Sequence, residues 1–416
     1  MSDMSGRVVV TGLGVVSSIG LNKDEFWKGL LEGRSGISKV EPDDPEAYEA
    51  SGLGEYIGEI KNFDFEAFFP DHPEQYPRAA QMALVSAREA LGDACFPLED
   101  GNFRVGVAFG TTMGEAQVVT QVSDVMESEG KDKVPEHLGD FYFAPKITTS
   151  LGAAFNLYGP NIMLTNACAA GSVALSYGFE KIRSGVADAM LVGGTDAFSR
   201  TALGGFSRMG AVADGLPRPF DAQRTGMIVA EGAGSLIIES LEHALARKAP
   251  IYSEVLDYGL SCDAHHITRL HLPGLVHGMR QALDRSGVKP EDVSYISVHG
   301  TGTKANDATE AAALREVFGE QLNHIPISSI KSMLGHSMGA ASALECVASN
   351  MAIRHGVLPP TANFRELDPE FEKGLDVVPN QGREHRVEVV LKTASAFGGN
   401  NCAIVFRKYR EQEARA

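Results

Sequence analysis

Cysteine is scarce in this sequence, which has 416 residues and only five cysteines. The cysteines are odd in number, widely separated and without metal-ligand spacings such as C-x-x-C, so the sequence predicts no metal site. Positive charge is also in short supply, because 37 Lys and Arg residues are outnumbered by 54 Asp and Glu residues. The resulting net charge of −17 argues against nucleic acid or an anionic membrane as the main partner.

No stretch of the sequence is apolar enough, over enough residues, to predict a membrane span. Residues 151–179 carry no charge, but a Gly-Pro pair and several Asn and Ser residues interrupt them. Residues 1–7 lack the basic start and apolar core of a signal peptide. We therefore expect a globular protein of the reducing cytoplasm, long enough to bury a large core in more than one structural unit.

The residues around Cys168 predict a sharp turn from a strand into a helix. An apolar run at 162–164 is typical of a buried strand, and small residues from 169 onward can open a helix. The helix N-terminus offers unpaired N–H groups and partial positive charge, which we expect to stabilise a thiolate at Cys168. An inert, packed cysteine is the alternative, because unpaired cysteines are commonly buried.

Strand-and-turn patterns in the second half of the sequence repeat those of the first half in the same order. The matched segments are 8–10 with 295–298, 162–164 with 325–330, 188–192 with 387–391, and 234–238 with 402–406. The repeat predicts an α/β protein of two duplicated halves, residues 1–255 and 256–416. If the halves pack about a pseudo-twofold axis, Cys168 faces His299 and His336 across one cleft. Helical spacing of apolar residues also predicts helices over 24–31 and 79–91.

A cysteine, two histidines, a lysine and a glutamate form a coherent set for carbon–carbon bond chemistry on thioesters. Neutral imidazoles at His299 and His336 can donate hydrogen bonds to a thioester carbonyl and stabilise the negative charge that develops on its oxygen. Lys331 and Glu345 lie on either side of His336 in the sequence, and a salt bridge between strand and helix is their alternative role.

Three motifs closely resemble those of the β-ketoacyl-acyl carrier protein synthases. They are NACAAG at 166–171, HGTGT at 299–303 and KSMLGHSMG at 331–339, with further similar stretches at 218–226, 261–266 and 397–399. The likeness spans nearly the whole chain and is greatest to the elongating type II group, which has two histidines. It implies a thiolase-like fold, a five-layered αβαβα sandwich, and a homodimer or a heterodimer with a chain-length factor.

The resemblance also implies a role for each candidate residue. Cys168 takes the acyl chain from an acyl carrier protein, and its N–H and that of the gate residue Phe397 form an oxyanion hole. His299 and His336 promote decarboxylation of the malonyl-loaded carrier, and the carbanion attacks the Cys168 thioester. Phosphopantetheine on the carrier holds the substrates, so no separate cofactor is expected. The remaining roles are organisation of His299 by Lys331 and Glu345, and substrate binding by Thr301, Thr303, Phe397, Gly398 and Gly399.

Two departures from the family pattern affect these expectations. The glycine loop that usually reads FGFGG is SAFGG at 395–399, and a serine at this place is shared with aromatic-polyketide ketosynthases. Ala396 replaces a glycine, so we expect a strained, left-handed backbone there and a biased gate that a hydrogen bond from Ser395 holds. Residues 68–82 hold one Lys or Arg, Arg78, where relatives often carry a basic cluster for carrier docking.

The leading hypothesis is a β-ketoacyl-[acyl-carrier-protein] synthase of fatty-acid elongation, which acts by a ping-pong, decarboxylative Claisen condensation. The alternative is the catalytic ketosynthase subunit of a type II polyketide or polyene system. A thiolase acting on coenzyme A esters is less favoured, because only Cys402 lies near the C-terminal glycine loop and it falls beyond the expected position. A non-catalytic chain-length subunit is opposed by the presence of Cys168, His299 and His336.

Overall fold

The computed structural model describes residues 6–41, 48, 51–71, 73–98, 102–141, 143–371 and 374–411. The prediction that residues 1–7 are no signal peptide falls mostly outside these ranges, because residues 1–5 are not among the described residues. Within the described ranges, no helix is long and apolar enough to cross a membrane. The same residues contain no group of three or more His, Cys, Asp or Glu side chains that could hold a metal ion.

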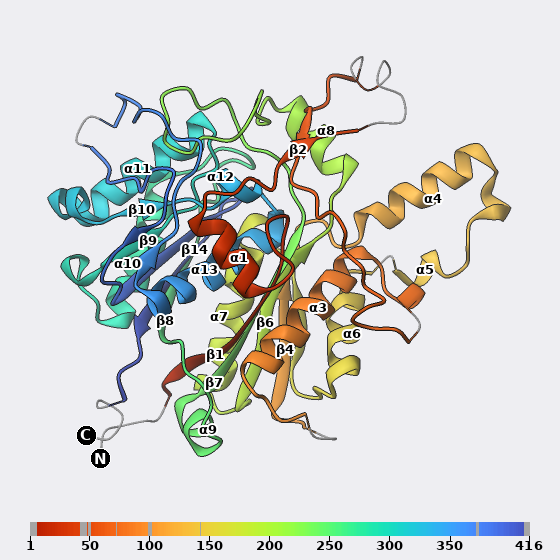
Figure 1. The fold of residues 1–416 in the computed structure, drawn as a ribbon, viewed down its shortest axis with the longest axis horizontal. Coiled ribbons are helices and arrows are strands. Elements are labelled where there is room, and N and C mark those ends of the chain that lie inside the picture. Colours follow the sequence, from red (N-terminus) through yellow and green to blue (C-terminus); the bar gives the residue numbers. More distant parts are fainter. Residues whose placement is uncertain are drawn as a thin grey trace.

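A ten-stranded sheet runs through the middle of the molecule (Figure 1). Its strands are β1 (Val8–Val16), β4 (Val105–Gly110), β5 (Asn161–Leu164), β6 (Ala189–Asp196), β7 (Gly232–Ser240), β8 (Ser253–Cys262), β9 (Tyr295–Ser297), β10 (Ile327–Ser328), β13 (Val389–Ser395) and β14 (Asn400–Lys408). Their order is β10-β9-β13-β14-β8-β1-β7-β6-β4-β5. Within each half, three strands are parallel and the next is antiparallel: β5, β4 and β6 precede antiparallel β7, as β10, β9 and β13 precede β14.

The strand order is symmetric about the antiparallel β1–β8 pair, as two duplicated halves require. β7, β6, β4 and β5 follow β1 outward in the order in which β14, β13, β9 and β10 follow β8. By this position β9 corresponds to β4, so the predicted match between segments 295–298 and 8–10 is wrong. The counterpart of β1 is β8, which we did not predict as a strand.

The sequence pattern hides β8 because this strand carries Glu254 and Asp257, which are both buried. Ion pairs with Arg7 and Arg183 compensate these carboxylates and allow them to lie inside a sheet. The predicted boundary at residue 255 falls inside the strand. We propose that the second half begins with β8, at Ser253.

Helices form three layers around and between the two halves of the sheet (Figure 1). One outer layer packs on the first half, the other on the second half, and the middle pair contacts strands of both halves. This arrangement confirms the predicted αβαβα sandwich. The layers are α3 (Arg78–Asp93) with α6 (Pro145–Phe155), then α7 (Ala170–Arg183) with α13 (Ala341–His355), then α10 (Leu272–Ser286) with α11 (Lys304–Phe318).

The two central helices come close together because small residues face each other. A side chain at Gly171 of α7 would place its Cβ 2.8 Å from Ala343 of α13, which is closer than packed atoms allow. α13 is buried on every side from Ala341 to Ile353. This central pair brings the strand-to-helix turns of the two halves next to each other, and the candidate site lies there.

The remaining elements lie at the periphery of the sandwich. The helices predicted over 24–31 and 79–91 correspond to α1 (Lys23–Leu31) and α3. Figure 1 shows α4 projecting away from the rest of the molecule. The other peripheral elements are α4 (Ala116–Ser128), α5 (Leu138–Phe141), α8 (Arg200–Arg208), α9 (Leu241–Ala246) and the short strands β2 (Ser38–Lys39), β3 (Tyr56–Ile57), β11 (Val357–Leu358) and β12 (Arg383–Glu384). The short helix α12 (Lys331–Leu334), in contrast, is buried next to the candidate site.

Candidate active site

Cys168 lies at a turn between β5 and α7, as the sequence predicts. The turn is a 3-10 segment, η3 (Ala167–Ala169), and Ala167 takes a left-handed φ of 47° that redirects the chain. Such a backbone costs a non-glycine residue about 1–2 kcal/mol, so the surrounding packing must hold the turn in place. The Cys168 side chain is buried and lines a cavity of about 510 Å³.

Burial dominates the proton affinity of Cys168. It raises the pKa of the thiol to about 11, and the Asp196 carboxylate acts in the same direction. The Lys331 ammonium and the backbone N–H groups of Cys168 and Phe397, which hydrogen-bond the sulfur, lower the pKa but do not offset burial. The expected resting thiolate is therefore wrong: Cys168 is a thiol at neutral pH, with two N–H donors converging on its sulfur.

His299 lies just beyond β9, and a buried glutamate of α11 fixes its backbone. The carboxylate oxygens of Glu310 accept hydrogen bonds from the N–H groups of His299 and Gly300, each at 2.8 Å. The Lys331 ammonium donates to the His299 carbonyl oxygen at 2.6 Å and lies 3.3 Å from Nδ1 of the ring. Since an ammonium only donates, Nδ1 is the acceptor and the ring proton is on Nε2.

His336 lies between α12 and a second 3-10 turn, η6 (Met338–Ala340), which leads into α13. The Met338 N–H donates to Nδ1 of His336 at 3.2 Å, so this ring also carries its proton on Nε2. The centroids of the His299 and His336 rings are 5.4 Å apart and their planes are nearly perpendicular. Both rings and Cys168 line the same cavity.

Both histidines are neutral. Burial lowers the pKa of each ring well below its usual value, and the positive charges of Lys331 and Lys392 lower it further. A neutral ring whose Nδ1 accepts a hydrogen bond keeps Nε2–H as its free donor. The site therefore combines one thiol with two uncharged N–H donors from imidazoles.

A buried cluster of charged side chains contacts His299 through Lys331. Lys331 pairs with one oxygen of Glu345, and the other oxygen lies 2.9 Å from Nζ of Lys392. Sequence analysis missed Lys392, because the predicted strand at 387–391 stops one residue before it. The sequence does contain a signal for this residue, because a lysine directly follows an apolar run. Since β13 continues past that run, Lys392 lies inside the core with no exposed surface.

The predicted substrate-binding residues divide into two groups. Thr301 and Thr303 line the cavity, and their hydroxyl oxygens are 2.9 Å apart. Thr303 also caps α11 by accepting a hydrogen bond from the Asn306 N–H. Gly398 and Gly399 do not line the cavity; they turn the chain beside it with φ of 84° and 77°, which favours glycine at both positions.

The loop around the expected gate differs from the sequence-based expectation. Ala396 does not have a positive φ, so the expected backbone strain is wrong. Ser395 is buried on the cavity wall, and among the described residues its hydroxyl makes no hydrogen bond that holds Phe397. The Phe397 ring instead contacts Phe206 of α8, with 5.5 Å between ring centroids.

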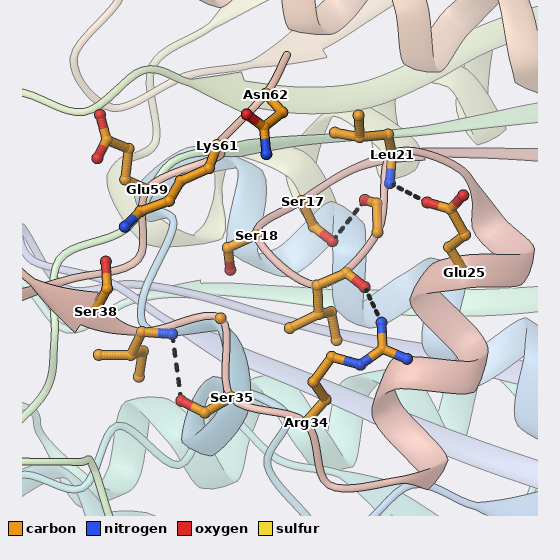
Figure 2. A pocket seen from close by; sticks show the side chains of 14 residues that line it. Ser17, Ser18, Leu21, Glu25, Arg34, Ser35, Ser38, Glu59, Lys61 and Asn62 are labelled. Carbon is orange, nitrogen blue, oxygen red and sulfur yellow. Dashed lines mark hydrogen bonds between the residues drawn. The ribbon is translucent and has the colours of Figure 1, made fainter.

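A separate hollow of about 390 Å³ lies near the N-terminus of α1, and Figure 2 shows its polar lining. Its side chains serve the local backbone: Ser17 donates to the Gly20 carbonyl at 3.0 Å, and Arg34 donates to the Ile19 carbonyl at 3.1 Å. None of the residues around Cys168 lines it. This hollow therefore holds none of the candidate catalytic residues.

The duplicated sandwich, with one cysteine and two histidines sharing a central cavity, defines a condensing enzyme of the thiolase fold. Family models agree: the β-ketoacyl synthase N-terminal domain matches residues 5–244, and the C-terminal domain matches residues 252–365. The chain belongs to the β-ketoacyl synthase family.

Individual relatives cover nearly the whole chain. The 3-oxoacyl-[acyl-carrier-protein] synthase 2 of Synechocystis sp. is 38% identical over 417 residues, which cover 97% of this chain and 98% of the relative. The solved ishigamide ketosynthase/chain length factor is 41% identical, with a TM-score of 0.92 and coverage of 97% and 99%. A type II polyketide ketosynthase bound to its acyl-carrier protein is 33% identical, with a TM-score of 0.88 and the same coverage.

Proposed function

We propose that this chain is a β-ketoacyl-[acyl-carrier-protein] synthase that acts in fatty-acid elongation. The observation that carries the proposal is one cavity in which a thiol with two converging N–H donors meets two neutral imidazoles with Nε2–H free. The relative named 3-oxoacyl-[acyl-carrier-protein] synthase 2 supports the same reaction. The enzyme is an acyltransferase that joins two acyl groups by a decarboxylative Claisen condensation.

The first half-reaction loads the acyl chain. The Cys168 sulfur attacks the thioester carbon of an acyl carrier protein, and the N–H groups of Cys168 and Phe397 stabilise the oxyanion that forms. Because the resting group is a thiol, its proton passes to water as the new C–S bond forms. The old C–S bond then breaks, and the departing pantetheine sulfur takes up a proton.

The second half-reaction forms the carbon–carbon bond. The Nε2–H groups of His299 and His336 donate to the thioester oxygen of malonyl-carrier, the bond to the carboxylate breaks, and CO₂ leaves its electron pair on an enolate. The enolate carbon attacks the acyl carbonyl, and the Cys168 sulfur leaves and takes up a proton from water, which restores the resting thiol. Lys331 and Glu345 hold His299 in place. The two cavity threonines contact the pantetheine arm, which belongs to the carrier, so no separate cofactor is needed.

Mass spectrometry of the purified protein tests this proposal. Incubation with a panel of acyl carriers should add one acyl mass to the peptide that contains Cys168. Subsequent malonyl-carrier should discharge it and yield a 3-oxoacyl-carrier two carbons longer. Failure of every acyl carrier to load Cys168 would contradict the proposal.

A second candidate function is the ketosynthase subunit of a type II polyketide or polyene system. The 41% identity to the ishigamide ketosynthase/chain length factor and the serine at 395 favour it. Product length separates the two functions. A fatty-acid synthase releases the chain after one extension for reduction, whereas a polyketide ketosynthase with its chain-length partner extends an unreduced chain repeatedly or accepts polyene intermediates.

The carrier docks at the mouth of the Cys168 cavity in this proposal. Arg269 and Lys304 line the cavity and are exposed, and Arg208 precedes the lining residue Met209. None of these three cations has a carboxylate within 4.0 Å among the described residues, although the chain as a whole is acidic. Arg78, in contrast, is committed to Glu231 at 2.8 Å. Free positive charge at the mouth suits an acidic carrier protein.

Charge reversal tests the docking surface. The Arg269→Glu and Lys304→Glu variants should each raise KM for the acyl carrier about tenfold and leave kcat nearly unchanged, because each replaces a positive steering charge by a negative one. Lys408→Glu is the matched control. Lys408 is exposed and is the last residue of the nine-residue strand β14, which begins three residues after Phe397, so the length of the strand separates it from the cavity. Equal effects in the control and the mouth variants would contradict the docking surface.

A second chain is expected to cover the β5 edge of the molecule. β5 ends the sheet order and has one strand neighbour among the described residues, β4. The projecting α4 exposes Val119 and Met126, and Phe143 nearby in the sequence is also exposed. Strand edges and apolar patches of this kind favour association. We propose a homodimer, or a heterodimer with a chain-length factor, and multi-angle light scattering separates a dimer from a 44.4 kDa monomer.

A further inference from the structure

Lys392 has no part in the proposed reaction, although it pairs with Glu345, one of the residues that support the site. Its side chain is completely buried on β13. Nζ lies 2.9 Å from Oε2 of Glu345 and donates to the Ser172 hydroxyl at 3.1 Å. Apolar side chains of similar volume often stabilise a core as well as a buried ion pair does. Stability alone therefore does not account for a charge at this position.

Lys392 links the elements that carry the reacting groups. Ser172 lies on α7, four residues after Cys168, and Glu345 lies on α13 and pairs with Lys331. The next residue of β13, Thr393, points to the other support of His299 and donates to Glu310 at 2.8 Å. Two consecutive strand residues thus reach the two carboxylates that hold the His299 segment.

The charges around Lys392 do not balance within the cluster. Cys346 of α13 and Cys402 of β14 are neutral, because burial raises the pKa of their thiols to about 12 and about 11. Glu310 makes no ion pair with Lys331 or Lys392: burial raises the pKa of its carboxyl group, and its oxygens accept hydrogen bonds from the backbone of the His299 segment and from Thr393. Glu345 is the one carboxylate among the described residues that forms an ion pair with these lysines. Its Oε2 lies within ion-pair distance of Lys392 but makes no hydrogen bond of good geometry. Lys331 and Lys392 therefore share one carboxylate.

We propose that Lys392 is a positioning residue for the histidine pair: by sharing Glu345 with Lys331, it leaves one unbalanced positive charge beside His299 and His336 and keeps both rings neutral in acid. This inference rests on the proposed function, in which both rings act as Nε2–H donors. Protonation would place a second N–H on Nδ1, facing the Met338 N–H at His336 and the Lys331 ammonium at His299. Two facing donors repel, so the protonated rings would leave their positions.

Histidine titration in the Lys392→Met variant tests the inference without any substrate. In ¹³C-histidine-labelled protein, His299→Gln and His336→Gln variants assign the two ring signals. Loss of the ammonium should move the midpoint of one or both rings upward by on the order of one pH unit. The acid limb of malonyl-carrier decarboxylation should move upward with it. If the proposed function fails, decarboxylation is absent in both proteins but the shift in titration remains.

Two control variants separate charge from packing. Lys392→Met/Glu345→Gln removes one charge of each sign, so the net charge of the cluster and the ring midpoints should return to wild-type values. Ser172→Ala removes the hydrogen bond but no charge and should not move the midpoints. An unchanged titration in Lys392→Met, or an equal shift in Ser172→Ala, would overturn the inference. Lys392→Gln replaces Lys392→Met if circular dichroism shows that the latter does not fold.

Discussion

The two strand-to-helix turns at the centre of the molecule have the same backbone conformation but carry different side chains. Ala167 opens the turn before α7 with φ of 47°, and Met338 opens the turn before α13 with φ of 50°. The next residue is Cys168 in the first turn and Gly339 in the second. A Cβ at Gly339 would lie 2.7 Å from the backbone of Thr111, so the second turn has no room for a side chain.

Each turn is met by a loop from the opposite half, and the two loops differ in what they deliver. The loop after β13 brings the Phe397 N–H to the Cys168 sulfur. The end of β6 brings the Asp196 carboxylate to the Gly339 N–H at 2.6 Å. Asp196 is saturated by three further donors, which are the Thr111 hydroxyl and the N–H groups of Thr112 and Met113. The duplication thus gives both halves the same turn. Only the turn at Cys168 has room for a reactive side chain, because Asp196 and the backbone of Thr111 fill the space at Gly339.

The largest effect on condensation is expected when the turn at Cys168 loses its reactive side chain, as the turn at Gly339 has none. Cys168→Ala should lower condensation by more than about 10³-fold, because the acyl chain has no nucleophile to join. Decarboxylation of malonyl-carrier should survive, since both histidines remain. Product analysis by mass spectrometry and CO₂ release measure the two activities, and an unchanged unfolding curve shows that the fold is intact. Full condensation by this variant would remove Cys168 from the mechanism.

Loss of a histidine is expected to affect the other half-reaction. In His336→Ala, acylated Cys168 should still form, but decarboxylation should fall by about 10²–10³, as for the loss of one oxyanion donor. His299→Ala should behave similarly, because both rings offer Nε2–H to the same cavity. Quenched-flow assays of acyl loading and of CO₂ release separate the two steps. Normal decarboxylation in either variant would exclude that ring from the chemistry.

A side chain in the inert turn should affect stability more than chemistry. In Gly339→Ala the new Cβ would overlap the backbone of Thr111 and Thr112, so we expect a loss of about 1–3 kcal/mol in the free energy of unfolding. Gly92→Ala is the matched control, because its Cβ would have nothing within 4 Å. That variant should be neutral or slightly stabilising, since helical glycine is less favourable than alanine. Chemical denaturation of both variants checks the difference.

Much of the fold follows from the sequence because its signals are local. The apolar runs and glycine turns mark most strands, and small residues after Cys168 and His336 mark the two central helices. β8 does not follow, because its buried carboxylates are compensated by Arg7 and Arg183 from distant segments. Three of the four predicted strand matches agree with the order of the sheet. The match of 8–10 with 295–298 does not, since the counterpart of a strand depends on its place in the sheet.

The site shows the same division between local and distant information. The turn at Cys168 and the candidate histidines follow from motifs, whereas the protonation states depend on burial that no motif reports. Burial makes Cys168 a thiol and keeps both rings neutral. The role of Lys392 also depends on contacts with α7 and α13 that only the folded chain creates.

The smallest effect is expected at Ala396, in the loop that crosses to the reactive turn. A left-handed alanine would have stored about 1–2 kcal/mol, and its replacement by glycine would then change the gate equilibrium about five- to thirtyfold. Ala396 has no positive φ and is buried, so there is no strain to release. Ala396→Gly then adds only backbone freedom, about 0.5–1 kcal/mol, and acyl loading of Cys168 should change at most about fivefold. Quenched-flow loading rates for both proteins with one acyl carrier measure this, and a change beyond tenfold would show that the loop moves through a left-handed state during loading.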